Sequence, residues 1–207
     1  MFPAKNIFVE LISIVICGVA IGLLMAITAN AFVQIAVVAN EYRTNISWLE
    51  INLGTNTYSL SSIVSLLLAA TLITLLRKWI NIKDWAGPAD SIYAAHSANV
   101  STDTKKGLGS TLAALIVTSG GGSVGQYGPL VHFGSTIGLF IKNYFSLKMS
   151  ADIFIGCGVA AAISAGFNAP LAGVIFAHEA ILRHFSLRAI APIFIASISA
   201  SAFDEYF

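Results

Sequence analysis

Charged residues are scarce in this sequence: Asp, Glu, Lys and Arg make up only 10% of its 207 residues, whereas 57% are hydrophobic. A soluble globular domain carries about 25% charged residues, so the composition excludes an ordinary soluble fold and predicts a polytopic helical membrane protein. The net charge of +1 offers no basic surface for nucleic acid, which we exclude as a partner. Cys17 and Cys157 lie in apolar runs without ligand-like spacing, so we expect neither a disulfide nor a metal site.

Two long apolar runs open the chain. Leu11 to Asn40 contains no charged residue, and as a helix it measures ~45 Å against a hydrocarbon core of ~30 Å, which predicts a strongly tilted span. A polar segment over 41–56 precedes a second span of ordinary length over 57–76. Basic residues before the first run and after the second predict that the amino terminus is cytoplasmic. These residues are Lys5, Arg77, Lys78 and Lys83.

A third uncharged run, Gly107 to Ile141, is interrupted in its middle by a cluster of glycines and then by Pro129. Glycine weakens a helix interior and proline cannot continue one, but proline suits a first helical turn. We therefore predict one helix ending near Ser119, a glycine-rich turn, and a second helix starting between Tyr127 and Pro129. The unpaired N–H groups of that second helix would form an anion site inside the membrane.

Two further segments have the same kind of interruption. Gly87 to Ser91 opens a short helix to about residue 97, either as a surface turn or as a second half-helix directed inward, with Asp90 favouring the first-turn N–H groups. The run from Ile153 to His178 is broken over 166–170, and a last apolar segment covers 189–203. Interrupted spans are typical of transporter binding sites, and the pattern predicts an all-α protein with about eight helical segments.

The residues Gly121 to Gly125 also fit the G-x-S-x-G pattern of serine hydrolases. That pattern requires a strand-to-helix elbow in an α/β sheet, and this composition predicts no such sheet. An intramembrane serine protease with His132 or His178 as base is the remaining enzymatic alternative, and our prediction is that the protein is not an enzyme.

Three of these segments together resemble the CLC chloride channel and exchanger family. Gly125-Gln126-Tyr127-Gly128-Pro129, followed by Gly134, is similar to the family's G-x-E-G-P signature, and residues 166–176 resemble its F-N-A-P-L-A-G stretch. Gly87-Pro88-Ala89-Asp90-Ser91 falls where the family carries a G-S-G-I-P turn. The order and spacing agree over roughly 5–205, which corresponds to the amino-terminal half of a family subunit. Residues 1–207 are then a single membrane domain with tilted helices and broken half-helices, without the second, inverted half.

The resemblance implies that half-helix amino termini hold chloride near the membrane centre, with no cofactor besides the anion itself. Backbone N–H groups and helix dipoles bind an anion without a cationic side chain that would retain it. The residues that the resemblance assigns to the anion site are Gly125, Gln126, Tyr127, Gly128 and Pro129, together with Gly87, Pro88 and Ala89.

Two departures from the family's site concern its side chains. Tyr127 replaces the glutamate that competes with chloride and carries a proton. A phenol is neutral at pH 7, so Tyr127 either donates its O–H to the anion or packs at the helix start. Pro88 stands where the family has a serine hydroxyl, which leaves backbone N–H groups beyond it as the donors.

A third departure concerns the family's Glu-Glu pair, which aligns with Glu179 and Ala180. Glu179 is an ion-pathway candidate or a boundary partner of Arg183, and the adjacent His178 is a packing residue or part of that pathway. Because the positions expected to carry protons are changed, we predict passive chloride or anion permeation. The alternatives are a chloride/proton or fluoride antiporter, or a non-transporting half-length subunit. We expect a homodimer formed through about 170–203, or a partner that supplies the second half, in a prokaryotic inner membrane.

Overall fold

The computed structural model describes residues 4–45, 50–53, 56–97, 103–125, 127–145, 149–204 and 206. Within these residues the chain is almost entirely helical, as predicted, and three helices (α1, α2 and α8) are long and apolar enough to cross a membrane. The elements are α1 (Ala4–Thr44), β1 (Glu50–Leu53), β2 (Asn56–Ser59), α2 (Ser61–Ile80), α3 (Pro88–His96), α4 (Thr104–Ser119), α5 (Tyr127–Tyr144), α6 (Ala151–Phe167), α7 (Pro170–Phe176), the π-helical turn η2 (Ala177–Leu182) and α8 (Leu187–Asp204).

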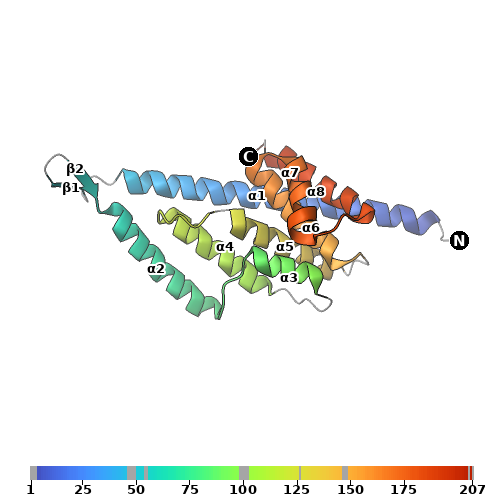
Figure 1. Cartoon of the computed structure of the whole chain (residues 1–207), viewed down its shortest axis with the longest axis horizontal. Coiled ribbons are helices and arrows are strands. Elements are labelled where there is room, and N and C mark those ends of the chain that lie inside the picture. Colours follow the sequence, from blue (N-terminus) through green and yellow to red (C-terminus); the bar gives the residue numbers. More distant parts are fainter. Residues whose placement is uncertain are drawn as a thin grey trace.

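The core of the molecule forms around α6. This helix packs against α5, α7, α8 and α1, and every residue from Ile153 to Ala165 is buried. A helix that is apolar on all sides is expected in such a central place. Figure 1 shows α1 running along most of the molecule's length, with the cluster of α5 to α8 beside it.

The contact between α5 and α6 depends on glycines. A Cβ on Gly158 would overlap the carbonyl group of Gly134, and a Cβ on Gly134 would overlap that of Gly158. A Cβ on Gly138 would likewise overlap the carbonyl group of Phe154. The two backbones are therefore in direct contact, which is how helices gain close packing where lipid supplies no hydrophobic drive.

Serine side chains fix α8 to α6 and α7. Ser164 Oγ donates to the Ser197 carbonyl at 2.6 Å, and Ser197 Oγ donates to the Pro170 carbonyl at 2.7 Å. On its other side α8 packs against α1, where a Cβ on Gly22 would lie 2.7 Å from the Ala196 carbonyl oxygen. The two serine hydrogen bonds thus join α6, α7 and α8 at the point where α7 begins.

The segment between α1 and α2 differs from the sequence-based prediction. Glu50–Leu53 and Asn56–Ser59 pair as an antiparallel hairpin, with Ile51 opposite Tyr58. We predicted a polar loop up to residue 56 and a span from residue 57. The second span instead begins at Ser61, because the residues before it are engaged in strand pairing. The first helix is also longer than predicted at both ends.

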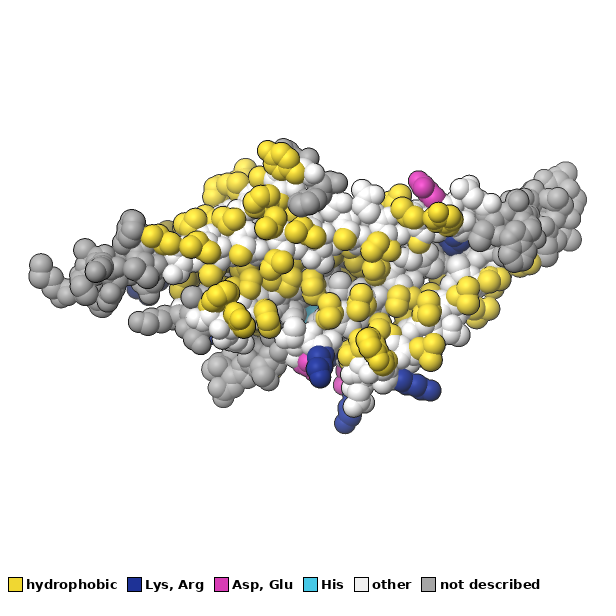
Figure 2. Space-filling view, turned by 180° about the vertical axis from the view of Figure 1, so that it is seen from behind, with side chains coloured by type: hydrophobic (Ala, Val, Ile, Leu, Met, Phe, Trp, Pro, Cys, Tyr) yellow, Lys and Arg dark blue, Asp and Glu magenta, His cyan; other side chains and the backbone are white. Residues whose placement is uncertain are grey.

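Helix α2 diverges from the rest of the molecule (Figure 1). Its buried residues are Ser61 and Ala69, and it meets α4 along one stripe, on which Ile80 lies against Gly109. The remaining faces carry exposed apolar side chains such as Leu67 and Trp79. Figure 2 shows hydrophobic side chains spread over the middle of one face of the molecule, with the charged groups near its margins. This distribution suits a protein surrounded by lipid.

Cys17 and Cys157 are buried free thiols, as the sequence predicted.

Candidate functional site

The predicted break between two half-helices is present. Helix α4 ends at Ser119, the chain turns through glycines, and α5 begins at Tyr127. Gly121 has φ +90°, a backbone conformation that favours glycine. Ser65 of α2 donates to the Gly120 carbonyl at 2.8 Å and so fixes the turn to a neighbouring helix. Gln126, one of the predicted anion-site residues, lies outside the described residues.

A cation lies over this glycine turn. A Cβ on Gly121 would be 3.0 Å from Cζ of Arg43, so the absence of a side chain there makes room for the guanidinium. Arg43 donates to Ser62 Oγ at 2.7 Å and to Asn40 Oδ1. Among the residues that the structure describes, Arg43 forms no ion pair with a carboxylate. Its positive charge is therefore available to attract anions towards the turn.

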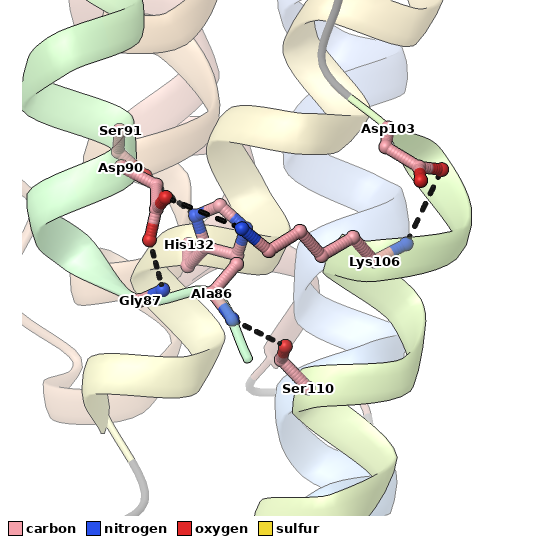
Figure 3. A network of polar contacts seen from close by, with 8 residues as sticks. All are labelled: Ala86, Gly87, Asp90, Ser91, Asp103, Lys106, Ser110 and His132. Atoms are coloured by element: carbon pink, nitrogen blue, oxygen red, sulfur yellow. Dashed lines mark hydrogen bonds and ion pairs between the residues drawn. The ribbon is translucent and has the colours of Figure 1, made fainter. Parts of the chain in front are cut away.

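Helix α3, the other short helix that the sequence predicted, begins at Pro88, with Gly87 as the residue before it. Asp90 accepts the N–H of Gly87 at 2.8 Å and lies 3.6 Å from the Lys106 ammonium group (Figure 3). Partial burial acts to raise the pKa of the Asp90 carboxyl, but the Gly87 N–H and the nearby Lys106 outweigh it, so that this pKa is lowered overall. The carboxylate thus stabilises the start of α3 and occupies one donor that an anion could otherwise use.

Buried polar contacts hold α3 on α5. Ser91 Oγ lies 2.9 Å from His132 Nδ1 and 2.7 Å from Ser135 Oγ, and all three side chains are buried. His132 and Ser91 lie on facing helices in Figure 3. His132 of α5 therefore connects this helix to α3. Its Nδ1 contacts Ser91, whereas Ser123 of the hydrolase-like pattern is exposed.

The starts of α3 and α5 meet at a cavity of about 440 Å³, which we call the apolar cavity. A Cβ on Gly128 would lie 3.6 Å from Cγ of Pro88. A helix leaves its first N–H groups without intrahelical partners, and Pro129 has no N–H, so Tyr127, Gly128 and Leu130 supply the donors of α5. The lining residues are Pro88, Tyr127, Gly128, Val131, Ile163, Phe167, Ala172 and Phe176.

Tyr127 is fixed at the edge of this cavity. Its hydroxyl donates to the Gly166 carbonyl at 3.1 Å, and its ring stacks on Phe167 with centroids 4.0 Å apart. The sequence left open whether the hydroxyl would donate to an anion. In this structure the hydroxyl is engaged by the protein itself.

Tyr127 also lines a second cavity, of about 170 Å³, which we call the polar cavity. Its lining residues come from α1, α5, α6 and α8 and are Ala29, Asn30, Val33, Gln34, Tyr127, Ala165, Gly166 and Asp204. The tyrosine therefore forms part of the wall of both cavities.

The structure brings together some of the predicted site residues and not others. Pro88, Tyr127 and Gly128 line the apolar cavity, Gly87 and Pro129 adjoin it along the chain, and Gly125 and Ala89 have exposed positions away from its lining.

His178 and Glu179, the predicted ion-pathway residues, lie in η2 and line neither cavity. His178 is fully buried, places Nδ1 3.1 Å from the His184 carbonyl oxygen and stacks on Phe185. Glu179 is exposed, and the described residues show no ion pair between it and Arg183, so the predicted alternative of a boundary pair is not seen.

Sequence reasoning missed the apolar wall and all of the polar cavity except Tyr127. Phe167 and Phe176 were part of a quoted motif but were given no role, and Val131 and Ile163 have no local signal because apolar residues are everywhere in this chain. Asn30 and Gln34 did carry a signal, since amides are uncommon in an uncharged span.

Comparison with known proteins agrees with this geometry. Residues 68–207 match the voltage gated chloride channel family. The chain is 27% identical over 115 residues to the voltage-gated ClC-type chloride channel ClcB of Yersinia pseudotuberculosis, an alignment that covers 56% of this chain and 28% of the relative. It is 25% identical over 135 residues to a putative ClcB-like chloride channel protein of Ralstonia nicotianae, covering 63% of this chain and 31% of that one.

Two solved structures share the fold. The crystal structure of a CLC-type fluoride/proton antiporter matches with a TM-score of 0.79 at 21% identity, covering 96% of this chain and 48% of that chain. A slow cyanobacterial Cl⁻/H⁺ antiporter matches with a TM-score of 0.71 at 19% identity, covering 92% and 45%. The matches thus cover about half of each solved structure and less than a third of each curated relative. On the match over residues 68–207, together with the two half-helices that meet at the apolar cavity, this integral membrane protein belongs to the voltage-gated chloride channel (CLC) family.

Proposed function

We propose that this chain mediates passive permeation of chloride or another small anion, held by the backbone N–H groups at the start of α5. The observation that carries the proposal is the meeting of two half-helix starts, at Pro88 and at Tyr127, on one apolar cavity. Each start carries about half a positive elementary charge. Beside a water-poor, apolar wall this partial charge attracts an anion more strongly than it would in bulk water.

The composition of the cavity wall suits transit rather than tight retention. No lysine or arginine is among its lining residues, and backbone dipoles bind an anion without the strong attraction of a full cation. Arg43, over the preceding turn, supplies attraction at a distance.

Proton coupling is lost in this proposal. Tyr127 stays neutral at pH 7 and is tied to Gly166, so it does not carry a proton through the site. Ala180 has no titratable group. The competing function is antiport, which is favoured by the likeness in fold to two antiporters, one for fluoride and protons and one for chloride and protons.

We further propose that a second copy, or a partner supplying the remaining half, completes the anion site. The region over 170–203 carries exposed apolar side chains suited to such a contact: Leu171, Ile175, Phe185, Leu187 and Ile198. The expected location is a prokaryotic cytoplasmic membrane with the amino terminus inside, because the curated relatives named above are bacterial and the basic residues gather at the inner ends of the first two spans.

Anion-replacement flux in proteoliposomes tests the proposal. Chloride, fluoride and larger anions are compared in wild type, Tyr127→Ala and Gly128→Leu, with Leu67→Ala on the exposed face of α2 as the matched control. We expect downhill anion flux, raised by Tyr127→Ala and abolished by Gly128→Leu, whose side chain fills the space beside Pro88.

Stoichiometric proton movement driven by an anion gradient would assign antiport instead. Absence of flux for every anion, in a particle of verified composition, would assign a non-transporting subunit.

A further inference from the structure

Asp204 does not lie where its position in the sequence suggests. It follows the last apolar run, as if it marked a return to solvent, yet it lies beside the middle of α1. Asn30 of α1 and Asp204 both line the polar cavity. Figure 1 shows α8 ending beside α1 well short of the end that carries the hairpin.

This position places a carboxylate beside the uncharged run of α1. Asn30 belongs to the uncharged run from Leu11 to Asn40 and precedes the end of that run by ten residues, or ~15 Å along a helix. An ionisable side chain in such a place is costly and is by default a functional residue.

The polar cavity around Asp204 offers a proton-binding environment. Its wall presents the amides of Asn30 and Gln34 and the side chain of Tyr127, and the remaining lining residues are alanine, valine and glycine. Among the described lining residues, which come from α1, α5, α6 and α8, Asp204 and Tyr127 are the titratable ones and Asp204 is the one that carries charge at pH 7. Among the lining residues that the structure describes there is no cationic side chain to neutralise that charge; Arg43 lies nine residues beyond Gln34 on α1.

We propose that Asp204 is a proton-binding site that controls anion access to the polar cavity. An ionised carboxylate repels an anion that enters the same cavity, whereas a protonated carboxyl removes the repulsion and adds an O–H donor. Because Tyr127 lines both cavities, the proton acts next to a residue that also borders the proposed anion site. The control of flux rests on the proposed function, whereas proton binding at Asp204 does not.

Anion flux in proteoliposomes is measured from about pH 4 to about pH 7.5, a range across which a carboxyl group changes charge. We expect wild-type flux to rise on the order of tenfold on acidification. Asp204→Asn should hold a high flux at all pH values, and Asp84→Asn, which removes an exposed carboxylate that lines neither cavity, should retain the wild-type profile. A pH profile of Asp204→Asn that matches wild type overturns the proposal.

Two measurements cover the other outcomes. Asn30→Leu replaces a polar amide of the cavity wall with an apolar side chain, which disfavours a charged carboxylate there, and should move the midpoint of the flux profile to higher pH. A merely structural role for Asp204 would not do so. Infrared difference spectroscopy follows protonation without any flux: we expect a protonated carboxyl band in wild type that is lost in Asp204→Asn. Absence of flux at every pH contradicts the proposed function alone, and absence of that band contradicts the proton site.

Discussion

Replacing Gly158 by alanine tests the backbone contact on which the proposed anion site depends. The added methyl group would overlap the carbonyl carbon and oxygen of Gly134, both of which belong to the backbone and cannot rotate away. Gly156 provides a matched control two residues earlier on the same helix. A Cβ there would meet Cδ1 of Ile193 at 2.7 Å, the end of a flexible side chain.

The structure sets the expected magnitudes. Forcing an extra methyl into a packed interface costs about 1–3 kcal/mol, and Gly158→Ala should lie at the upper end because two helix backbones must separate. Gly156→Ala displaces one side-chain end and gains up to about 1 kcal/mol of helix propensity, so its net effect should be near zero.

Thermal unfolding in detergent, followed by circular dichroism, measures the difference. Gly158→Ala should also reduce anion flux, because the separation moves α5 and with it the N–H groups at Tyr127. Equal unfolding temperatures for the two variants would show that α5 and α6 are not in backbone contact, and the account of the core given above would be wrong.

Three more substitutions probe the site. Gly166→Ala would place a methyl 2.5 Å from Cε1 of Tyr127, so the ring must leave its stacked position; we expect altered flux with an ultraviolet difference signal from the tyrosine, and an unchanged spectrum would contradict the stacking. Gly121→Ala should lower the stability of the protein by about 1 kcal/mol because Gly121 has a positive φ. The added methyl group should also displace Arg43. We expect this displacement to raise the anion concentration for half-maximal flux more than it lowers the maximal rate. Asp90→Asn should lower stability by about 0.5 kcal/mol in thermal unfolding, because the amide keeps an acceptor for the Gly87 N–H but loses the negative charge at the start of α3. Because the Asp90 pKa is lowered by folding, its stabilisation is present above the unfolded pKa and is lost as pH falls through the folded one, so the variant and wild type should converge in acid.

The helix breaks could be predicted because they are written in local backbone chemistry. Glycines around 120–125 and prolines at 88, 129 and 170 limit where a helix can continue or start, whatever surrounds them. Helices α3 and α7 begin at two of these prolines, Pro88 and Pro170. Helix α5 begins at Tyr127, two residues before Pro129. The starts of α3, α5 and α7 could therefore be predicted without knowledge of the tertiary fold.

The hairpin and the polar cavity could not be predicted in this way. Strand pairing over 50–59 depends on one segment meeting another, and four-residue strands have weak sequence signals. Asp204 looked like the end of a span, since nothing in the sequence states that α8 stops beside Asn30. The roles of Pro88 and Tyr127 were assigned by motif, but the hydrogen bond from Tyr127 to Gly166 depends on how α5 and α6 pack.

The exposed position of α2 has a mechanical consequence. Most of this helix is exposed, while its inner stripe is bonded through Ser65 to the Gly120 carbonyl in the turn that precedes α5. A bilayer that becomes thinner or thicker changes the preferred inclination of an apolar helix of fixed length. Any such reorientation of α2 pulls on the hinge of the broken helix, so the thickness of the host membrane becomes one of the forces that set the shape of the anion site.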